Sequence, residues 1–244
     1  GRAPPTAAPD PSLPTGRITG TITLRGKPEV MRVPQKRREA EGCGPADRPY
    51  NAVITHDGAL RDVLVRLAGE VPFPRSTVVP AERRIVLDRV SCVYEPRIQG
   101  VMVTPDGPGR TLLEIRNSDD VLHQLHAYLN RETLWAPATP RSAPPVVKEM
   151  GGPGVYTFTC DVHPWMRAFI VASPHPYFDV TGDTGQYTLP NIPPGSHEVE
   201  AWHSQYGWKK HPPIIVTADV TTKVDLTYST TDPIPEENRG ETFP

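Results

Sequence analysis

The stretch from Gly154 to Phe169 reads GVYTFTCDVHPWMRAF and combines a strand pattern with three candidate metal ligands. Alternation of apolar and polar residues over GVYTFTC, and again over RAFIVAS, predicts two strands. Between these strands, Cys160, His163 and Met166 follow one another at intervals of three residues. A thiolate, an imidazole and a thioether form a soft ligand set, which favours copper or zinc over magnesium or calcium. The stretch therefore predicts a β-protein with a metal site at the end of a strand.

The rest of the chain indicates short strands joined by many fixed turns. Its 244 residues include 31 Pro and 19 Gly, and proline interrupts helix interiors and central strands. Short apolar runs bounded by Pro and Gly recur at the spacing that is typical of a β-sandwich. Besides the two runs above, they lie at 17–26, 63–67, 85–90, 99–103 and 111–116. The sequence therefore predicts an all-β fold built from sandwiches.

The composition and the motifs argue against several classes of function. The chain has 26 basic and 28 acidic residues and a formal net charge of -2, which gives no electrostatic signature for nucleic acid or an anionic membrane. No run approaches the roughly 18 apolar residues that span a bilayer. The sequence has no Gly-rich phosphate loop, no Gly-x-Ser-x-Gly turn and no convincing pair of nucleophile and base. We therefore expect no enzyme, no nucleic-acid partner and no direct membrane span.

Two upstream histidines could complete a metal site with Cys160, His163 and Met166. A blue-copper site uses two histidines, one cysteine and a weak axial methionine, and His123 and His126 lie in the segment NSDDVLHQLHAY. They are three residues apart, so on one extended strand they face opposite sides and only one should face the metal. The segment also fits a short amphipathic helix with solvent-facing histidines. Zinc instead of copper, a disulfide at Cys160 and a site without metal are further alternatives.

Taken together, NSDDVLHQLHAY and GPGVYTFTCDVHPWM resemble the cupredoxin family, and most closely its amicyanin and plastocyanin-like type. In that family an Asn ends a strand six residues before the first ligand His, which is the interval from Asn117 to His123. A Gly-x-Tyr-x-x-x-Cys run and a short Cys-x-x-His-Pro-aromatic-Met loop follow, and this chain has both. The resemblance covers residues from about 80 to 175 and implies a Greek-key β-sandwich.

The resemblance also implies one type 1 copper ion, with one-electron transfer as the activity. The implied ligands are His123, Cys160, His163 and Met166. By the same resemblance, Pro164 and Trp165 would form part of an exposed apolar patch through which electrons leave. The family usually joins its ligand loops through an Asn after the first His and a Ser or Thr after the Cys. This chain has Gln124 and Asp161 at those positions, and contacts around the ligands tune the metal.

The flanking segments resemble a second family, the carboxypeptidase regulatory-like, or transthyretin-like, sandwich. GRITG matches the first strand of that family, and later turns match a Thr-Asp-x-x-Gly-x-aromatic-x-Leu run followed by Pro-x-Gly-x-aromatic. The matching residues are Thr181, Gly185, Tyr187, Leu189, Pro194 and Gly195, and His197 stands at the usual aromatic position. The first strands precede the cupredoxin-like segment and the others follow it. The order therefore favours an inserted copper domain over two domains in series.

The expected domain boundaries follow from this insertion. They are 1–16 for a Pro-rich N-terminal arm, 17–79 and 177–229 for the discontinuous regulatory-like sandwich, 80–176 for the cupredoxin domain and 230–244 for a C-terminal tail. An aromatic group around His203 in the last part of the sandwich could be a docking patch, or it could pack in the core and at its edge. Its members are Trp202, Tyr206 and Trp208.

The three cysteines bear on the compartment. If Cys160 holds copper, Cys43 and Cys92 are free to form a disulfide, with two unpaired thiols as the alternative. The pair would need an oxidising compartment, so we expect a periplasmic or otherwise extracytoplasmic protein after removal of a signal peptide.

The expected partner is a redox protein such as a c-type cytochrome or a membrane oxidoreductase. The chain would serve it alone or as a subunit of a larger assembly. The alternatives for its function are a structural or accessory β-sandwich subunit of a larger complex, and a copper delivery or storage protein.

Overall fold

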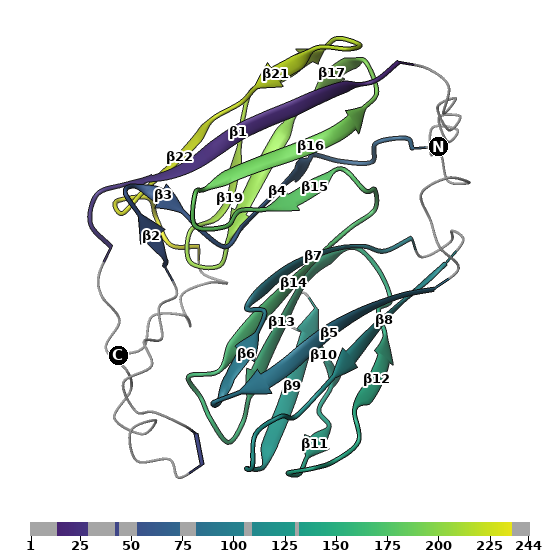
Figure 1. Cartoon of the computed structure of the whole chain (residues 1–244), viewed down its shortest axis with the longest axis vertical. Helices are drawn as coiled ribbons and strands as arrows, with labels where there is room; N and C mark the ends of the chain where they lie inside the picture. The colour runs from purple at the N-terminus through teal and green to yellow at the C-terminus, as the bar shows by residue number, and fades with distance from the viewer. Residues whose placement is uncertain are drawn as a thin grey trace.

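The structure of the chain is a computed structural model. It describes residues 14–28, 42–43, 53–73, 82–104, 109–129 and 132–235. These residues form strands, turns and connecting segments without any helix, so the all-β prediction is confirmed. The part described holds no helix of a length and hydropathy that would cross a membrane. Figure 1 shows the strands in two groups, with β5–β14 in one and β1–β4 and β15–β22 in the other.

The group β5–β14 is a sandwich of two sheets. One sheet has the strand order β10-β9-β13-β14-β7, and β11 also pairs with β9. Its strands are β10 (Glu132–Trp135), β9 (His123–Leu129), β13 (Gly154–Cys160), β14 (Arg167–Ser173), β7 (Ile98–Met102) and β11 (Ala138–Thr139). The facing sheet runs β12 (Val146–Glu149), β8 (Arg110–Ile115), β5 (Glu82–Val90) and β6 (Val93–Glu95). The predicted strands therefore exist, and the helix considered for the histidine segment is wrong because this segment is β9.

The alternating pattern of β13 places its side chains as the sequence predicts. Tyr156, Phe158 and Cys160 are buried and belong to the core of this sandwich. The next strand differs, because β14 is buried on both faces. Ala168 and Ile170 point into the same core, whereas Phe169 and Val171 pack against the other group of strands. Burial on two faces explains the near-continuous apolar run in this strand.

The second group also consists of stacked sheets. One has the order β16-β1-β3-β2, and β21 and β22 pair with β1; the others have the orders β15-β4-β18-β19 and β17-β20. The first comprises β16 (Gln186–Ile192), β1 (Gly16–Arg25), β3 (Ala59–Leu60), β2 (Thr55–His56), β21 (Thr221–Lys223) and β22 (Leu226–Ser229). The others comprise β15 (Phe178–Val180), β4 (Val63–Leu67), β18 (Val199–His203), β19 (Gly207–Lys210), β17 (Gly195–His197) and β20 (Ile214–Val216).

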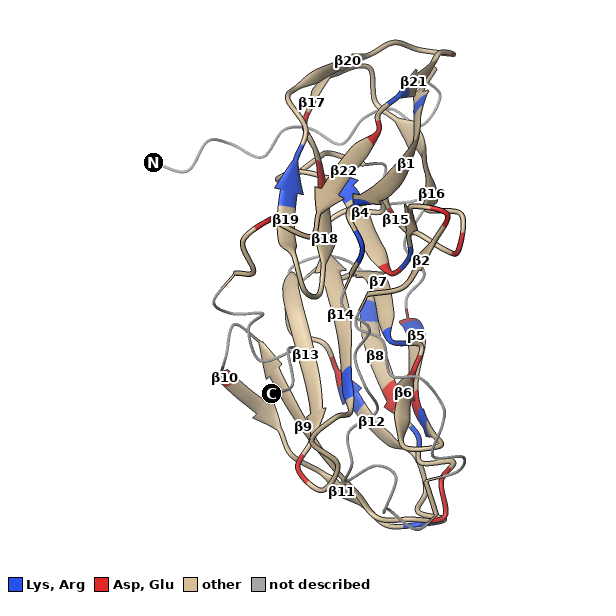
Figure 2. Cartoon of the chain, turned by 90° about the vertical axis from the view of Figure 1, so that its left-hand side faces the viewer, with Lys and Arg blue, Asp and Glu red and all other residues tan. Residues whose placement is uncertain are grey.

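Strands from both ends of the chain therefore pair with one another, while β5–β14 pair among themselves. The domain boundaries and the resemblance to the regulatory-like family stay predictions. Residues 1–13 of the expected arm and 236–244 of the expected tail lie outside the described residues. Figure 2 shows acidic and basic segments interspersed over both groups, as the small net charge leads one to expect.

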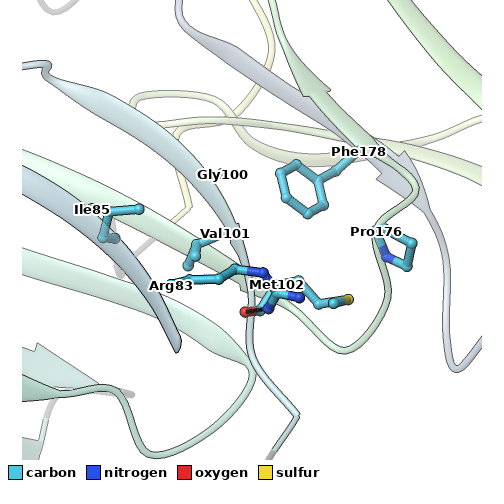
Figure 3. A pocket seen from close by; sticks show the side chains of 7 residues that line it. All are labelled: Arg83, Ile85, Gly100, Val101, Met102, Pro176 and Phe178. Carbon is cyan, nitrogen blue, oxygen red and sulfur yellow. Dashed lines mark hydrogen bonds between the residues drawn. The ribbon is translucent and has the colours of Figure 1, made fainter. Parts of the chain in front are cut away.

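The two groups of strands meet across β7 and β14. Phe169 and Val171 of β14 share a buried cluster with Leu64 of β4 and Trp202 of β18. On β7, a Cβ at Gly100 would lie 2.6 Å from the Phe178 ring, so this close approach requires glycine. A pocket of about 240 Å³ lies beside the contact (Figure 3). It is lined by Arg83, Ile85, Gly100, Val101, Met102, Pro176 and Phe178.

The aromatic group around His203 belongs mostly to the core. Trp202 is 3 % exposed, Tyr206 is 6 % exposed and His203 is fully buried, whereas Trp208 is 38 % exposed. The imidazole of His203 stacks on Tyr206 with ring centroids 5.1 Å apart. Packing therefore accounts for this group, and an exposed docking patch is wrong for all of its members except Trp208.

Candidate metal centre

Two neighbouring strands and one tight loop bring the sequence-predicted ligands together. β9 and β13 are antiparallel with Cys160 opposite Leu125, so His123 at the start of β9 lies next to the end of β13. The loop after Cys160 then turns back, with the Met166 N–H donating to the His163 carbonyl at 2.9 Å. His123, Cys160 and His163 consequently offer their ligand atoms in one buried cluster.

The three ligand atoms face one another at distances that suit one metal ion. The Cys160 Sγ lies 3.6 Å from the His123 Nδ1 and 3.7 Å from the His163 Nδ1, and the two Nδ1 atoms are 3.1 Å apart. Bonds of about 2.0–2.3 Å in a trigonal plane separate their donors by about 3.5–3.8 Å. The two distances from the sulfur match this value, and the shorter nitrogen pair corresponds to a narrower angle. The donor set therefore fits a copper ion.

The centre is shielded from solvent. His123 and Met166 are fully buried, Cys160 is 2 % exposed and His163 is 7 % exposed. Met166 belongs to the same buried core cluster as Cys160, and its backbone is held next to His163 by the hydrogen bond to the His163 carbonyl. The four predicted ligands thus share one region of the core, and their role as copper ligands stays a prediction.

The surroundings favour a thiolate at Cys160. Burial alone opposes the charged form, but hydrogen bonds from His123 and His163 outweigh it and lower the pKa of the Cys160 thiol to about 6. A thiolate is the form of cysteine that binds metals. The protein thus presents its sulfur donor in the form a soft metal requires at neutral pH.

Asp119 is a residue of the candidate site that the sequence prediction missed. Its carboxylate, which is only 6 % exposed, lies 2.9 Å from the His123 Nε2. The imidazole can therefore donate its N–H to Asp119 while its Nδ1 faces Cys160. A carboxylate behind a histidine ligand fixes the orientation of the ring and raises its basicity. In the sequence, the only indication was a carboxylate four residues before His123.

The β5–β6 turn holds Asp119 in place. Ser91 and Cys92 form this two-residue turn, and both have left-handed φ angles, 54° and 53°, as a hairpin of type I′ requires. Their N–H groups donate to the Asp119 carboxylate at 2.5 and 2.9 Å. Burial raises the pKa of Asp119, but the hydrogen bonds from His123 and this turn outweigh that effect and lower it. Asp119 is therefore a charged group at the edge of the site.

Arg89 places a buried positive charge near the site. Its side chain is fully buried; Nε donates to the Arg116 carbonyl at 2.9 Å and Nη1 donates to the Thr139 hydroxyl. Thr139 donates in turn to the His123 carbonyl at 3.0 Å. Burial lowers the pKa of Arg89, while the charge of Cys160 is among those that raise it. Nothing in the sequence pattern indicated that this arginine would be buried.

The two ligand loops are joined through the backbone. The Asp161 N–H donates to the Gln124 carbonyl at 2.9 Å. His126 lies on the opposite face of β9 from His123, with its Nδ1 3.4 Å from the Asp161 carboxylate. The opposite orientation of the two histidines agrees with the strand alternation, and only His123 faces the cluster.

A disulfide joins Cys43 and Cys92, as predicted. It lies against the site, because the Cys43 Sγ is 3.8 Å from the His163 Nε2. Trp165 is 2 % exposed and donates its indole N–H to the Cys92 carbonyl at 3.0 Å. The expectation that Trp165 lies in an exposed patch is therefore wrong, because the indole packs into the core beneath the turn. Pro164 is exposed, and its part in electron transfer stays a prediction.

Solved structures of amicyanin are similar to part of this chain. A reduced Cu(I) form of an amicyanin variant at pH 4 is 21% identical, with 45% of this chain and 98% of that chain covered at a TM-score of 0.31. The reduced state of a second variant has the same identity and coverage and a TM-score of 0.32. An oxidized variant has 21% identity, the same coverage and a TM-score of 0.31. No protein-family model and no curated protein matches the chain.

Proposed function

We propose that the chain is a type 1 copper protein that carries single electrons between extracytoplasmic redox partners. The observation that carries this proposal is the convergence of the Cys160 Sγ and the Nδ1 atoms of His123 and His163 at 3.1–3.7 Å in a buried site. Two imidazoles and one thiolate in a trigonal arrangement, with a methionine nearby, are the donors of a blue-copper centre. Bound copper would supply a one-electron couple there.

The protein's own residues would keep this site rigid and closed. Asp119 orients His123 through the hydrogen bond to its Nε2, and the His163 carbonyl accepts from the Met166 N–H. Burial of all four side chains keeps water out. Four donors from the protein leave no position for a substrate, unlike catalytic metal sites, which keep one open. The chain would therefore act as a carrier and not as an enzyme.

The partner would dock where side chains next to the ligands reach the surface. Leu122 and Val162, each adjacent in sequence to a ligand histidine, are 49 % and 47 % exposed, and Pro164 is exposed as well. Exposed apolar side chains beside a buried redox centre suit a brief encounter with a c-type cytochrome or a membrane oxidoreductase. The Cys43–Cys92 disulfide supports an oxidising, extracytoplasmic compartment.

Titration of the purified protein with Cu(II), followed by visible absorption, tests the proposal. The expected result is an intense blue colour that saturates at one copper per chain. Cys160→Ala should abolish the colour, whereas His126→Ala should keep it, because His126 faces away from the cluster. A colourless wild-type protein with bound copper, or a colour that survives in Cys160→Ala, would overturn the assignment.

The electron-carrier role needs its own measurement. The copper-loaded protein should accept and return one electron reversibly, with exchange to a c-type cytochrome that slows in Leu122→Ser and Val162→Ser. A centre that is coloured but exchanges no electrons with cytochromes or other redox proteins would refute the role while leaving the copper site in place.

A further inference from the structure

We propose that Cys43, Cys92 and His163 form a second, latent Cu(I) site that opens when the disulfide is reduced. The site would use the Nε2 of the imidazole whose Nδ1 faces Cys160. This inference goes beyond the electron-carrier function and stands on its own geometry. It assigns a metal-binding role to a cysteine pair that otherwise only crosslinks the chain.

The first argument is proximity. The Cys43 Sγ lies 3.8 Å from the His163 Nε2, and both sulfurs and a nitrogen of His163 lie within 4.8 Å of one another. Donors at about 3.5–3.8 Å fit a single ion with three ligands. Reduction of the disulfide would therefore leave two thiols next to an imidazole nitrogen, and the two sulfurs would move apart from bonding distance to enclose a metal ion.

The second argument is the position of the His163 ring. It stands between two sulfur groups, with Nδ1 3.7 Å from the Cys160 Sγ and Nε2 3.8 Å from the Cys43 Sγ. A neutral imidazole has only one nitrogen with a free lone pair. The two sites are therefore alternative positions for one ion that compete for His163. The redox state of the cysteine pair would decide which site the ion occupies.

The third argument is the chemistry of the donors. Two thiolates and an imidazole are soft ligands, which select Cu(I) among the common metals. Zinc prefers four ligands, and the nearby carboxylate of Asp119 is already bound to His123, Ser91 and Cys92. Cys43 is 1 % exposed and Cys92 is fully buried, so a Cu(I) ion there would be protected from water.

The opening step needs a dithiol reductant, such as a protein of the thioredoxin type. The dithiol gives two electrons and two protons to the Cys43–Cys92 bond, which becomes two thiols, and the dithiol itself becomes a disulfide. Binding of Cu(I) then displaces the thiol protons into solution. The copper ion does not change its oxidation state in this step.

The Cys160→Ala variant isolates the latent site, because it removes the only thiolate of the proposed blue-copper site. Cu(I) affinity would be measured without oxygen by competition with bicinchoninate, for the disulfide form and for the form reduced with a phosphine. Thiol counting confirms the reduction, and circular dichroism confirms that the protein stays folded. The reduced form is expected to bind one Cu(I) at least about 100-fold more tightly than the disulfide form.

Two further variants assign the ligands. Adding Cys43→Ser to Cys160→Ala should remove the gain in affinity on reduction, and adding His163→Ala should weaken it. X-ray absorption of the reduced Cys160→Ala protein should show two sulfur neighbours around copper. Equal affinities for the two redox forms, or a disulfide that cannot be reduced in the folded protein, would overturn the inference. Neither outcome affects the blue colour expected of the oxidised wild-type protein, so the two proposals fail separately.

Discussion

Asp119→Asn isolates the influence of one carboxylate on the metal centre. The Asp119 carboxylate accepts from the imidazole of His123 at 2.9 Å and from the N–H groups of Ser91 and Cys92 at 2.5 and 2.9 Å. Asparagine has nearly the same shape but only one acceptor oxygen, so its amide N–H₂ would face at least one of these donors. The substitution therefore removes a negative charge and loosens His123 without leaving a cavity.

The size of the effect follows from these contacts. Loss of a group that orients a metal-bound histidine typically weakens metal binding by about 10–100-fold. The negative charge of Asp119 favours Cu(II) over the less positive Cu(I). The substitution should therefore weaken mainly the binding of Cu(II). Each tenfold difference between the two oxidation states corresponds to about 59 mV for one electron. We therefore expect the reduction potential to rise by about 60–120 mV.

The assay is a redox titration of the copper-loaded protein, followed by its visible absorption, together with competition titrations for Cu(II) affinity. Asp120→Asn is the matched control, because it removes the same charge from the neighbouring position. The Asp120 side chain is 82 % exposed, and it forms a long ion pair of 3.9 Å with the exposed Arg141. This substitution should leave the potential unchanged. A folded Asp119→Asn protein whose potential equals that of Asp120→Asn would refute the assignment of Asp119 as a positioning residue.

Three further predictions concern charge, pH and the crosslink. Arg89→Gln should lower the reduction potential, because a buried positive charge near Cys160 disfavours Cu(II); an unchanged potential in redox titration would contradict this. Burial and, second, the charge of Arg97 lower the pKa of His203 from 6.5 to about 3. As the pH falls, His203 therefore takes up a proton in the unfolded chain before it does so in the folded protein. The free energy of unfolding should then decrease as the pH falls from about 6.5 toward 3. In urea unfolding, the free energy of unfolding of His203→Asn should decrease less with falling pH than that of the wild-type protein. An identical pH dependence in the two proteins would contradict the role of His203. The 49-residue separation of the disulfide cysteines predicts a stabilisation of about 4 kcal/mol, which Cys43→Ala with Cys92→Ala should remove in chemical unfolding of the metal-free protein; a loss below about 1 kcal/mol would show that the crosslink constrains little.

The candidate ligands could be found from the sequence because their spacing is local. Cys160, His163 and Met166 lie within one strand end and one tight loop, so their proximity needs little information about the rest of the fold. The period of a strand also predicted that only one of His123 and His126 faces the metal, since residues three apart on a strand face opposite sides. Spacing alone did not choose between them, and the cupredoxin-like pattern around Asn117 supplied that choice.

The residues around the ligands could not be found in the same way. Cys43 reaches His163 across 120 residues of sequence, and Arg89 reaches Thr139 across 50. Such contacts depend on which strands become neighbours and on where a turn points its N–H groups. The pattern of a strand gives its period but not the partner on each face. For this reason the burial of Trp165, and of β14 on both sides, did not follow from the sequence.

The sequence by itself determined an all-β fold and the donor types of the candidate metal centre, because these rest on local alternation and local spacing. It left Cys43 and Cys92 as the disulfide pair only on the condition that Cys160 binds the metal. Only the tertiary structure decided that Asp119 stands behind His123, that the disulfide covers the outer nitrogen of His163, and that the indole of Trp165 lies inside. The physical reason is that orientation and charge at a buried site are set by long-range packing, which places groups from distant segments within a few ångströms of each ligand.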